Sequence, residues 1–389
     1  MLSKAPKSTM KKKLIRVVTS DISFVLVKGQ LKFLSSNYEV IAVSSAGKLL
    51  DDIPNTEGVQ TKSIEISRQI SLIKDIKALY QLYKFFKKEK PDIVHSMTPK
   101  AGLLSMMAAF FSGVPIRIHT FTGLIFPTKR GLLKQILIFM DKIVCICATK
   151  IIPEGNGVKN DLLAYSITSK PLEIVANGNI NGVNMEFYNP ALFDDNLIMQ
   201  LKEDLNISIN DYVFVFAGRL VGDKGINELI KAFSNFNKKF ENSKLLLVGT
   251  YENTYDPLSP QTINDIKTNK NILNTGWVND VRSYFAISNC LVFPSYREGF
   301  PNVVLQACAM KLPCIVTNIN GCNEIITNNE NGIIIPIKNT AAIYSAMERL
   351  FQMSKKDHET MGEISRNIIV SKFEQQFVWN AILKEYQSL

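Results

Sequence analysis

Histidine and cysteine are scarce in this chain, which limits its chemistry. Its 389 residues include three histidines, too few for us to expect a histidine-based metal site. The six cysteines form no spaced disulfide framework, so we expect free thiols in a reducing compartment. Cys145 and Cys147 are separated by one residue and have no histidine nearby. We therefore interpret them as buried cysteines of a β-strand, not as a metal or redox pair.

Long apolar runs are also missing. No stretch of about 18–20 uncharged apolar residues occurs, so we expect no membrane-spanning helix. Residues 1–13 are basic, but no apolar segment with a cleavage site follows them, so they do not match a secretory signal. We predict a short disordered tail there. Hydrophobic residues make up 46% of the chain, enough to bury a large core and to exclude disorder throughout.

Positive charge is concentrated in the first half. The formal charge is +10, but residues 1–190 carry a net +12 and residues 191–389 a net −2. Such an excess is typical of proteins that bind nucleic acid, anionic membranes or phosphorylated substrates, and also of a plain solvated surface. The sequence has no RRM, KH, zinc or helix-turn-helix signature, so we expect no nucleic-acid partner.

Short β-rich runs alternate with helical patterns in two successive sets. The first set predicts strands at 14–19, 38–43, 93–95, 116–120, 142–147 and 173–175. The second set predicts strands at 212–217, 244–248, 272–275, 290–293, 313–317 and 332–336. This alternation predicts an α/β protein with two doubly wound parallel sheets. Ligands of such sheets bind beyond the carboxyl ends of the strands.

The two sets define the expected domains. We predict a basic tail at 1–13, a Rossmann-like domain at 14–185 and a second Rossmann-like domain at 186–365. A C-terminal helix at 366–389 is expected to pack back on the first domain. The stretch 177–189, rich in Asn and Gly, is interpreted as the connection between the domains.

The sharpest motif is the segment 217–225, which follows an apolar strand and opens a helix. Gly218 allows a tight turn, Arg219 offers a planar fork of donors and Lys224 adds a point charge. One loop can bring both cations to a single anion, although a plain basic surface loop is the alternative. The P-loop pattern GxxxxGK[ST] is absent from the chain.

The second motif is the segment 294–307, in which a helix is expected to start near residue 302. The start of this helix should leave free the N–H groups of Asn302, Val303 and Val304, which favours a phosphate. Glu298 suits sugar hydroxyls as a hydrogen-bond acceptor, and Gln306, two turns into the helix, can also meet hydroxyls. A carboxylate beside a Gly-rich turn is also often a simple cap.

Taken together, the two motifs resemble those of the retaining glycosyltransferases of family 4. That family carries a G-R-L…K-G element, matched at 218–225, and an E-G-F element, matched at 298–300. The resemblance covers nearly the whole chain and implies a GT-B fold, with two facing Rossmann-like domains and a ligand cleft between them. It also implies that the domain at 14–185 binds the acceptor and that the domain at 186–365 binds the nucleotide-sugar. Residues 95–102 and 177–179 look like bacterial members that build surface polysaccharide repeat units on a lipid carrier.

The resemblance also implies roles for individual residues. Arg219 and Lys224 would hold the donor diphosphate and stabilise the charge of the leaving group, and Glu298 would contact the donor sugar. The other expected donor-binding residues are Gly218, Val278, Gly299, Phe300, Pro301, Asn302, Val303 and Gln306. The residues expected at the acceptor site or in the cleft are Gly29, Lys100, His119 and Thr122.

The sequence departs from the family pattern at several positions. Gln306 stands where the family has a second Glu that binds ribose, so altered ribose contact is expected. Thr122 occupies the position of a His found in many relatives, and we interpret His119 as a structural hydrogen-bonding residue. The glycine-rich loop of the first domain is reduced to Gly29. We interpret Trp277 as core packing in preference to base stacking.

The implied reaction is transfer of a hexose or N-acetylhexosamine from a nucleoside-diphosphate donor, UDP-linked, to a hydroxyl of a polyprenyl-diphosphate-linked sugar. Such steps build capsule or O-antigen. No Asp-x-Asp motif occurs, so neither a metal nor another cofactor is expected; the nucleotide-sugar is a substrate. The alternatives are a nucleotide-sugar epimerase or an inverting transferase of the same fold. Epimerised donor in the absence of acceptor would indicate the former.

The basic first half also contains a segment suited to binding a membrane surface. The segment 72–90 places apolar residues at helical spacing among lysines, so it can lie on an anionic membrane. An ordinary domain helix with its apolar stripe in the core is the alternative. We expect a cytoplasmic protein that associates peripherally with the inner face of the cell membrane.

Overall fold

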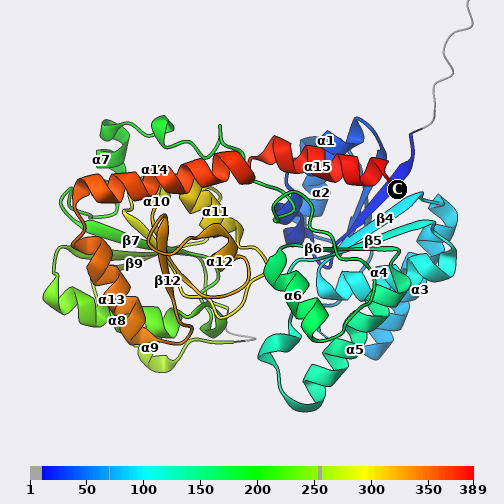
Figure 1. The fold of residues 1–389 in the computed structure, drawn as a ribbon, viewed down its shortest axis with the longest axis horizontal. Coiled ribbons are helices and arrows are strands. Elements are labelled where there is room, and N and C mark those ends of the chain that lie inside the picture. Colours follow the sequence, from blue (N-terminus) through cyan, green and yellow to red (C-terminus); the bar gives the residue numbers. More distant parts are fainter. Residues whose placement is uncertain (1–10, 70, 253–255) are drawn as a thin grey trace, which may run out of the picture. The chain divides into compact units, whose positions relative to one another are not determined.

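The computed structural model describes residues 11–69, 71–252 and 256–389 (Figure 1). Its first sheet has six parallel strands in the order β3-β2-β1-β4-β5-β6. These strands are β1 (Lys13–Val17), β2 (Glu39–Ser44), β3 (Gln60–Ser63), β4 (Ile93–Met97), β5 (Ile116–Phe121) and β6 (Lys150–Pro153). The helices between them are η1 (Asp21–Val27), α1 (Gln30–Ser35), α2 (Lys48–Thr56), α3 (Leu72–Glu89), α4 (Pro99–Ser112), η2 (Phe126–Thr128) and α5 (Gly131–Cys147), with α6 (Asn156–Ala164) after the last strand.

The second sheet is also parallel and six-stranded, in the order β12-β11-β10-β7-β8-β9. Its strands are β7 (Tyr212–Ala217), β8 (Ser243–Val248), β9 (Ile272–Gly276), β10 (Cys290–Phe293), β11 (Cys314–Thr317) and β12 (Gly332–Ile335). Its helices are η3 (Pro190–Leu192), α7 (Asp195–Asp204), η4 (Gly222–Lys224), α8 (Ile226–Lys239), α9 (Pro260–Thr268), α10 (Arg282–Ala286), α11 (Asn302–Ala309), α12 (Cys322–Ile325), α13 (Thr340–Phe351) and α14 (Lys355–Lys372). The last helix of the chain is α15 (Gln375–Gln387).

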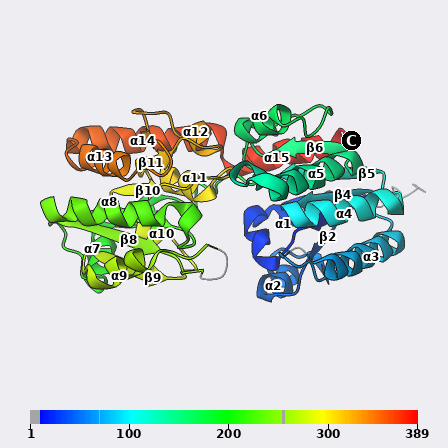
Figure 2. The ribbon, with the colours of Figure 1, turned by 90° about the horizontal axis from the view of Figure 1, so that it is seen from below.

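Helices cover both faces of each sheet, which confirms the predicted α/β, doubly wound, GT-B class. In the first half, α4 packs between α3 and α5 (Figure 2). In the second, α8 packs with α9 and α13, whereas α11 packs with α12 and α14 on the opposite side of the strands (Figure 1). The inner strands are apolar along their length because they are buried on both faces, as in β7, where Val213 to Phe216 are fully buried.

Contacts divide the chain into two compact units. The first unit comprises the chain up to Glu154, Val158–Val175 and Trp379–Leu389, and the second comprises Gly155–Gly157 and Ala176–Val378. The chain therefore changes unit near 175 and again near 378, where the sequence suggested 185 and 365. Residues 1–10 of the expected tail lie outside the described part.

The strand predicted at 142–147 is wrong, because these residues form the last turns of α5. Val144, Cys145 and Cys147 are buried on that helix. A short apolar run does not distinguish a buried strand from a buried helix, so the apolar pattern led to the wrong secondary structure. The six cysteines are free and buried, as expected. Burial raises the pKa of the Cys145 thiol to about 12.

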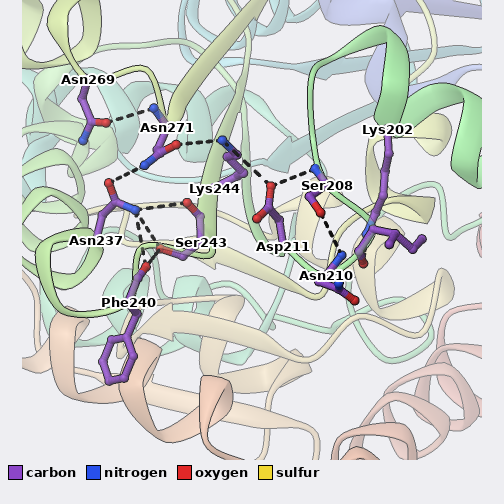
Figure 3. A network of polar contacts seen from close by, with 11 residues as sticks. Lys202, Ser208, Asn210, Asp211, Asn237, Phe240, Ser243, Lys244, Asn269 and Asn271 are labelled. Carbon is purple, nitrogen blue, oxygen red and sulfur yellow. Dashed lines mark hydrogen bonds and ion pairs between the residues drawn. The ribbon is translucent and has the colours of Figure 1, made fainter.

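Figure 3 shows a polar network at the amino-terminal ends of β7, β8 and β9. The side-chain amide nitrogen of Asn271 donates to the side-chain oxygen Oδ1 of Asn237 at 2.8 Å. Its own carbonyl oxygen accepts from Lys244 Nζ at 2.7 Å, and Lys244 also lies 3.9 Å from Asp211. Side chains that satisfy one another thus close this edge of the second sheet, whereas both sequence motifs follow the carboxyl ends of strands.

A buried polar cluster attaches α15 to the first sheet. Arg16 Nη1 on β1 donates to the Tyr386 hydroxyl at 2.5 Å, and that hydroxyl lies 2.5 Å from His95 Nδ1 on β4. His95 Nε2 lies 2.7 Å from the Thr120 hydroxyl. Burial holds the pKa of His95 well below its usual value, so the imidazole is neutral and Arg16 carries the charge. One phenol thus supplies a partner to two buried side chains.

We expect Tyr386→Phe to lower the free energy of unfolding by about 1–3 kcal/mol, because the buried Arg16 and His95 each lose a hydrogen-bond partner. Chemical denaturation monitored by circular dichroism measures this change. Tyr38→Phe is the control, since Tyr38 is buried and its hydroxyl forms no hydrogen bond within the described residues. Equal effects of the two substitutions would contradict the role of the cluster.

Candidate functional site

The two sequence motifs lie at one edge of the second sheet. Strands β10, β7 and β8 are neighbours in that sheet, so the loops that leave their carboxyl ends are adjacent. The backbones come very close: a Cβ atom on Gly249 would lie 1.9 Å from the carbonyl oxygen of Gly218. The loops after β7, β8 and β10 therefore lie together at this edge. The loop after β7 is called here the phosphate loop (218–225).

Glycine is required where the phosphate loop enters α8. Gly225 has φ +70°, and a Cβ atom there would lie 2.2 Å from the carbonyl oxygen of Pro294. Only glycine combines that backbone conformation with that close approach. The contact brings the phosphate loop against the segment 294–298, and the N–H of Tyr296 donates to the carbonyl of Asp223 at 2.8 Å.

Lys224 and Glu298 form an ion pair between the two motifs. Their side chains are only 17% and 16% exposed. The Ser295 hydroxyl donates to the same carboxylate oxygen of Glu298 at 2.7 Å. Lys224 Nζ also lies 5.3 Å from the centre of the Phe293 ring. A partly buried carboxylate and ammonium are thus held side by side at the end of the sheet, where a diphosphate and sugar hydroxyls could contact both.

Arg219 extends from the same loop but has a different partner. Its Nη1 donates to Oε2 of Glu252, a residue of the loop after β8. The Arg219 side chain is 53% exposed, and Glu252 is 22% exposed. The structure therefore brings Lys224 and Glu298 into contact, while the Arg219 guanidinium stays accessible beside a second carboxylate.

Helix α11 begins at Asn302, as the sequence indicated, with Pro301 as its N-cap. The N–H of Val304, expected to be free, instead donates to the carbonyl of Pro301 at 3.1 Å. Asn302 and Val303 are partly exposed, whereas Phe300 is buried and packs against Phe373. The start of the helix thus leaves two backbone N–H groups, not three, available to an anion.

Asp256 is a residue of this site that the motifs did not reveal. Its carboxylate accepts from the N–H of Asp223, and its carbonyl accepts from the N–H of Gly222 at 3.0 Å. Asp256 thereby supports η4, the short turn that carries Lys224. The one local signal was an aspartate directly before Pro257, which marks a turn but does not identify the turn's partner.

The interpretation of Trp277 as core packing is wrong. Its side chain is 71% exposed, directly after the edge strand β9. Val278, the adjacent residue, is the one that packs against the core. An exposed indole at the ligand-binding edge of a sheet can stack on a planar ring. The apolar context of the sequence could not distinguish these two neighbouring positions.

In the first unit, His119 is fully enclosed. Its Nδ1 lies 2.8 Å from the Ser96 hydroxyl, its ring packs edge-on against Phe121, and a Cβ atom on Gly102 would lie 2.3 Å from its Cε1. Burial lowers the pKa of His119 to about 3, so the ring is neutral. These contacts account for His119 as a structural residue. The neighbouring Thr122 is partly exposed.

The other two residues expected at the acceptor site already have partners. Lys100 Nζ forms an ion pair with Asp75 at 2.7 Å. The N–H of Gly29 donates to the Glu57 carboxylate at 2.5 Å, and a Cβ atom on Gly29 would lie 2.8 Å from the Trp379 ring. The close packing and the φ of +83° thus explain why glycine occupies position 29. A role toward the acceptor stays a prediction for both residues.

The site combines cations, helix N–H groups and one carboxylate. Lys224, Arg219 and the start of α11 can bind a diphosphate, and Glu298 can accept hydrogen bonds from sugar hydroxyls. Among the residues that the structure describes, no group of three or more His, Cys, Asp or Glu side chains is placed to hold a metal ion. The chemistry available is anion binding with charge stabilisation.

Comparisons with known proteins give consistent matches. The family model described as glycosyl transferases group 1 matches residues 198–368, and the model glycosyl transferase 4-like matches residues 15–154. The capsular polysaccharide biosynthesis glycosyltransferase CapM of Staphylococcus aureus is 34% identical over 379 residues, which cover 97% of each chain. The UDP-Gal:alpha-D-GlcNAc-diphosphoundecaprenol alpha-1,3-galactosyltransferase of Escherichia coli is 33% identical over 311 residues, which cover 79% of this chain and 78% of that one.

Solved structures share the fold. A glycosyltransferase from Rickettsia africae ESF-5 superimposes with a TM-score of 0.78 at 21% identity, covering 97% of this chain and 98% of its own. Anabaena Alr3699/HepE, in complex with UDP and glucose, gives a TM-score of 0.81 at 13% identity, covering 97% and 100%. At these identities the likeness is one of fold.

The buried His119 makes a pH-dependent contribution to stability. Its pKa is about 3 in the folded protein and near 6.5 when unfolded, so the unfolded chain binds the extra proton as the pH falls below about 6.5. We expect the free energy of unfolding to decrease from pH 7 to pH 5, and His119→Phe to show a smaller decrease. Denaturation at both pH values measures it. An equal decrease in the variant would contradict the assignment. His95 and His358, whose pKa values burial also lowers, are unchanged in both proteins and contribute to the decrease that remains.

Proposed function

The chain belongs to the glycosyl transferases group 1 family, and from that membership we propose that it is a retaining, metal-independent enzyme. Its substrates are a UDP-linked hexose or N-acetylhexosamine and a hydroxyl of a lipid-linked sugar. One observation carries the proposal. The ion pair of Lys224 and Glu298 joins the two motif loops at the carboxyl edge of the second sheet, beside the start of α11.

The donor assignment rests on the charges of this edge. A nucleoside diphosphate needs cationic and N–H donors, which Lys224, Arg219 and α11 supply, and the sugar needs acceptors such as Glu298. The Anabaena protein of the same fold forms a complex with UDP and glucose, which supports a uridine nucleotide. The exposed Trp277 is suited to stacking on a planar base at the same edge.

The mechanism needs charge stabilisation more than it needs an enzyme base. As the bond between sugar and diphosphate breaks, negative charge develops on the leaving phosphate, and the ammonium of Lys224 and the guanidinium of Arg219 stabilise it. The acceptor hydroxyl attacks from the same face, and a phosphate oxygen of the donor takes its proton. Because the side chains supply the positive charge, the proposal assigns no role to a metal ion.

The acceptor assignment rests on relatives. The Escherichia coli relative is named for transfer to a GlcNAc on diphosphoundecaprenol, and the Staphylococcus aureus relative for capsular polysaccharide biosynthesis. A polyprenyl-diphosphate-linked sugar, used in building a surface polysaccharide, is the acceptor that follows. Such an acceptor is anchored in a membrane, so the enzyme has to work at a lipid surface.

Transfer can be tested with purified protein, a panel of UDP-sugars and a polyprenyl-diphosphate-linked GlcNAc. We expect one UDP-sugar to give a product with the donor's anomeric configuration, as seen by NMR, and equal rates with and without EDTA. An inverted product would refute the retaining mechanism, and epimerised donor without acceptor would refute the transferase reaction.

Lys224→Ala and Arg219→Ala should each lower turnover at least about 100-fold, the scale of lost charge stabilisation in a transition state. Lys239→Ala is the control, because Lys239 forms an exposed ion pair with Glu348 in the same unit. Thermal denaturation checks that each variant is folded. Wild-type turnover in both site variants would refute the phosphate assignment.

The first unit exposes apolar side chains suited to a membrane surface. Within the described part of the chain, no helix is long and apolar enough to cross a bilayer. Helix α3 buries Ala78, Leu82 and Phe86, as an ordinary domain helix would. Its other side, however, exposes large apolar residues: Leu72, Ile73, Ile76 and Tyr80. The apolar stripe predicted for this helix is therefore only partly in the core.

Helix α5 repeats this arrangement at the same edge of the first sheet. It exposes Leu132, Leu133 and Phe139, and the exposed Lys129 and Arg130 precede it. Both helices lead into parallel strands, so both begin at the carboxyl edge of the sheet. Exposed leucines and isoleucines among cations match an anionic bilayer, which supports peripheral association with the cytoplasmic face of the membrane.

We expect the protein to sediment with vesicles that contain anionic lipid, less strongly at high salt. The double variant Ile73→Ser, Leu132→Ser should partition about tenfold or more weakly, because each side chain would bury apolar area in the lipid. The control is Leu192→Ser with Ile209→Ser, two exposed apolar residues of the second unit. Equal binding by both double variants would contradict this surface.

A further inference from the structure

Glu252 is held beside Arg219 by the backbone, not by chance contact of two surface side chains. The N–H of Leu220 donates to the carbonyl of Thr250 at 2.9 Å, and Leu220 forms a β-bridge with Tyr251. The loop after β8 thus runs along the phosphate loop, and the bridged Tyr251 directly precedes Glu252. The carboxylate then accepts from Nη1 of Arg219.

The carboxylate occupies the kind of position that a phosphate would take. Guanidinium groups bind carboxylates and phosphates through the same planar fork of N–H donors. The Arg219 side chain nevertheless remains 53% exposed, so a ligand can reach it. A negative charge fixed at this guanidinium opposes the approach of a second anion, both by occupying a donor and by repulsion.

We propose that Glu252 competes with the donor diphosphate for Arg219 and so keeps nucleotide binding weak and release fast. This inference rests on the proposed function, because it requires Arg219 to bind the diphosphate. Glu252 is then a positioning residue: it acts through Arg219 and not on the reacting atoms. The sign of the effect is specific, since removing the charge of Glu252 tightens nucleotide binding, whereas losing a supporting contact would weaken it.

The test is calorimetric titration with UDP of the wild type and of Glu252→Gln, which keeps the shape and removes the charge. We expect the Kd for UDP to fall about two- to fivefold, the range of a partly exposed ion pair. The KM for the donor should fall with it, without an increase in kcat. Glu348→Gln is the matched control, because it removes one negative charge and one surface ion pair, with Lys239, from the same unit. Its Kd should equal that of the wild type.

A double-mutant cycle with Arg219→Ala separates the possible failures. In the Arg219→Ala background, Glu252→Gln should no longer tighten UDP binding. Unchanged or weaker binding in the single variant Glu252→Gln would overturn the competition and indicate that Glu252 merely orients Arg219. Unchanged UDP affinity in Arg219→Ala alone would instead refute the phosphate assignment on which the proposed function depends.

Discussion

The ion pair between Lys224 and Glu298 is the interaction on which the site depends. Both side chains are mostly withdrawn from water, and a charge in that position is stable only with a partner. The pair can form because Gly225 lets the phosphate loop pass within contact distance of Pro294. The absence of a side chain at Gly225 therefore allows the two motifs to meet.

A carboxylate lies against each of the two cations assigned to the site. Lys224 faces Glu298, Arg219 faces Glu252, and the turn between them is capped by Asp256. This explains how a half-chain with a slightly negative net charge can offer a diphosphate site. In the proposed function, the local geometry and not the overall charge supplies the positive field, and the carboxylates limit how strongly an anion binds.

The excess positive charge of the first half has a different setting. Part of this charge lies among exposed apolar residues, on α3 and just before α5, and the buried charged side chains described in that unit are Arg16, Glu57 and Glu154. His95 and His119 are buried, and burial keeps the pKa of both low. Most of the charge is thus at the surface, which is consistent with a unit whose exterior meets a charged partner.

Much of the second unit followed from local pattern. The strands predicted at 212–217 and 290–293 coincide with β7 and β10, because each is a continuous apolar run between turn residues. The strands of the first unit were harder to predict from the sequence. The run 142–147 is helical although it is as apolar as a strand, and β3 (Gln60–Ser63) was missed because its residues are polar and mostly exposed.

By itself, the sequence determined the fold class, the two motifs and the residue types that can bind a diphosphate, since these depend on neighbours along the chain. Tertiary structure decided which residues meet. The order β10-β7-β8 brings Glu298 and Glu252 to the two cations from loops 74 and 33 residues away along the chain. It also decided that Trp277 is exposed and Val278 packed. Strand order and the facing of side chains arise from packing between distant segments, which no local pattern encodes.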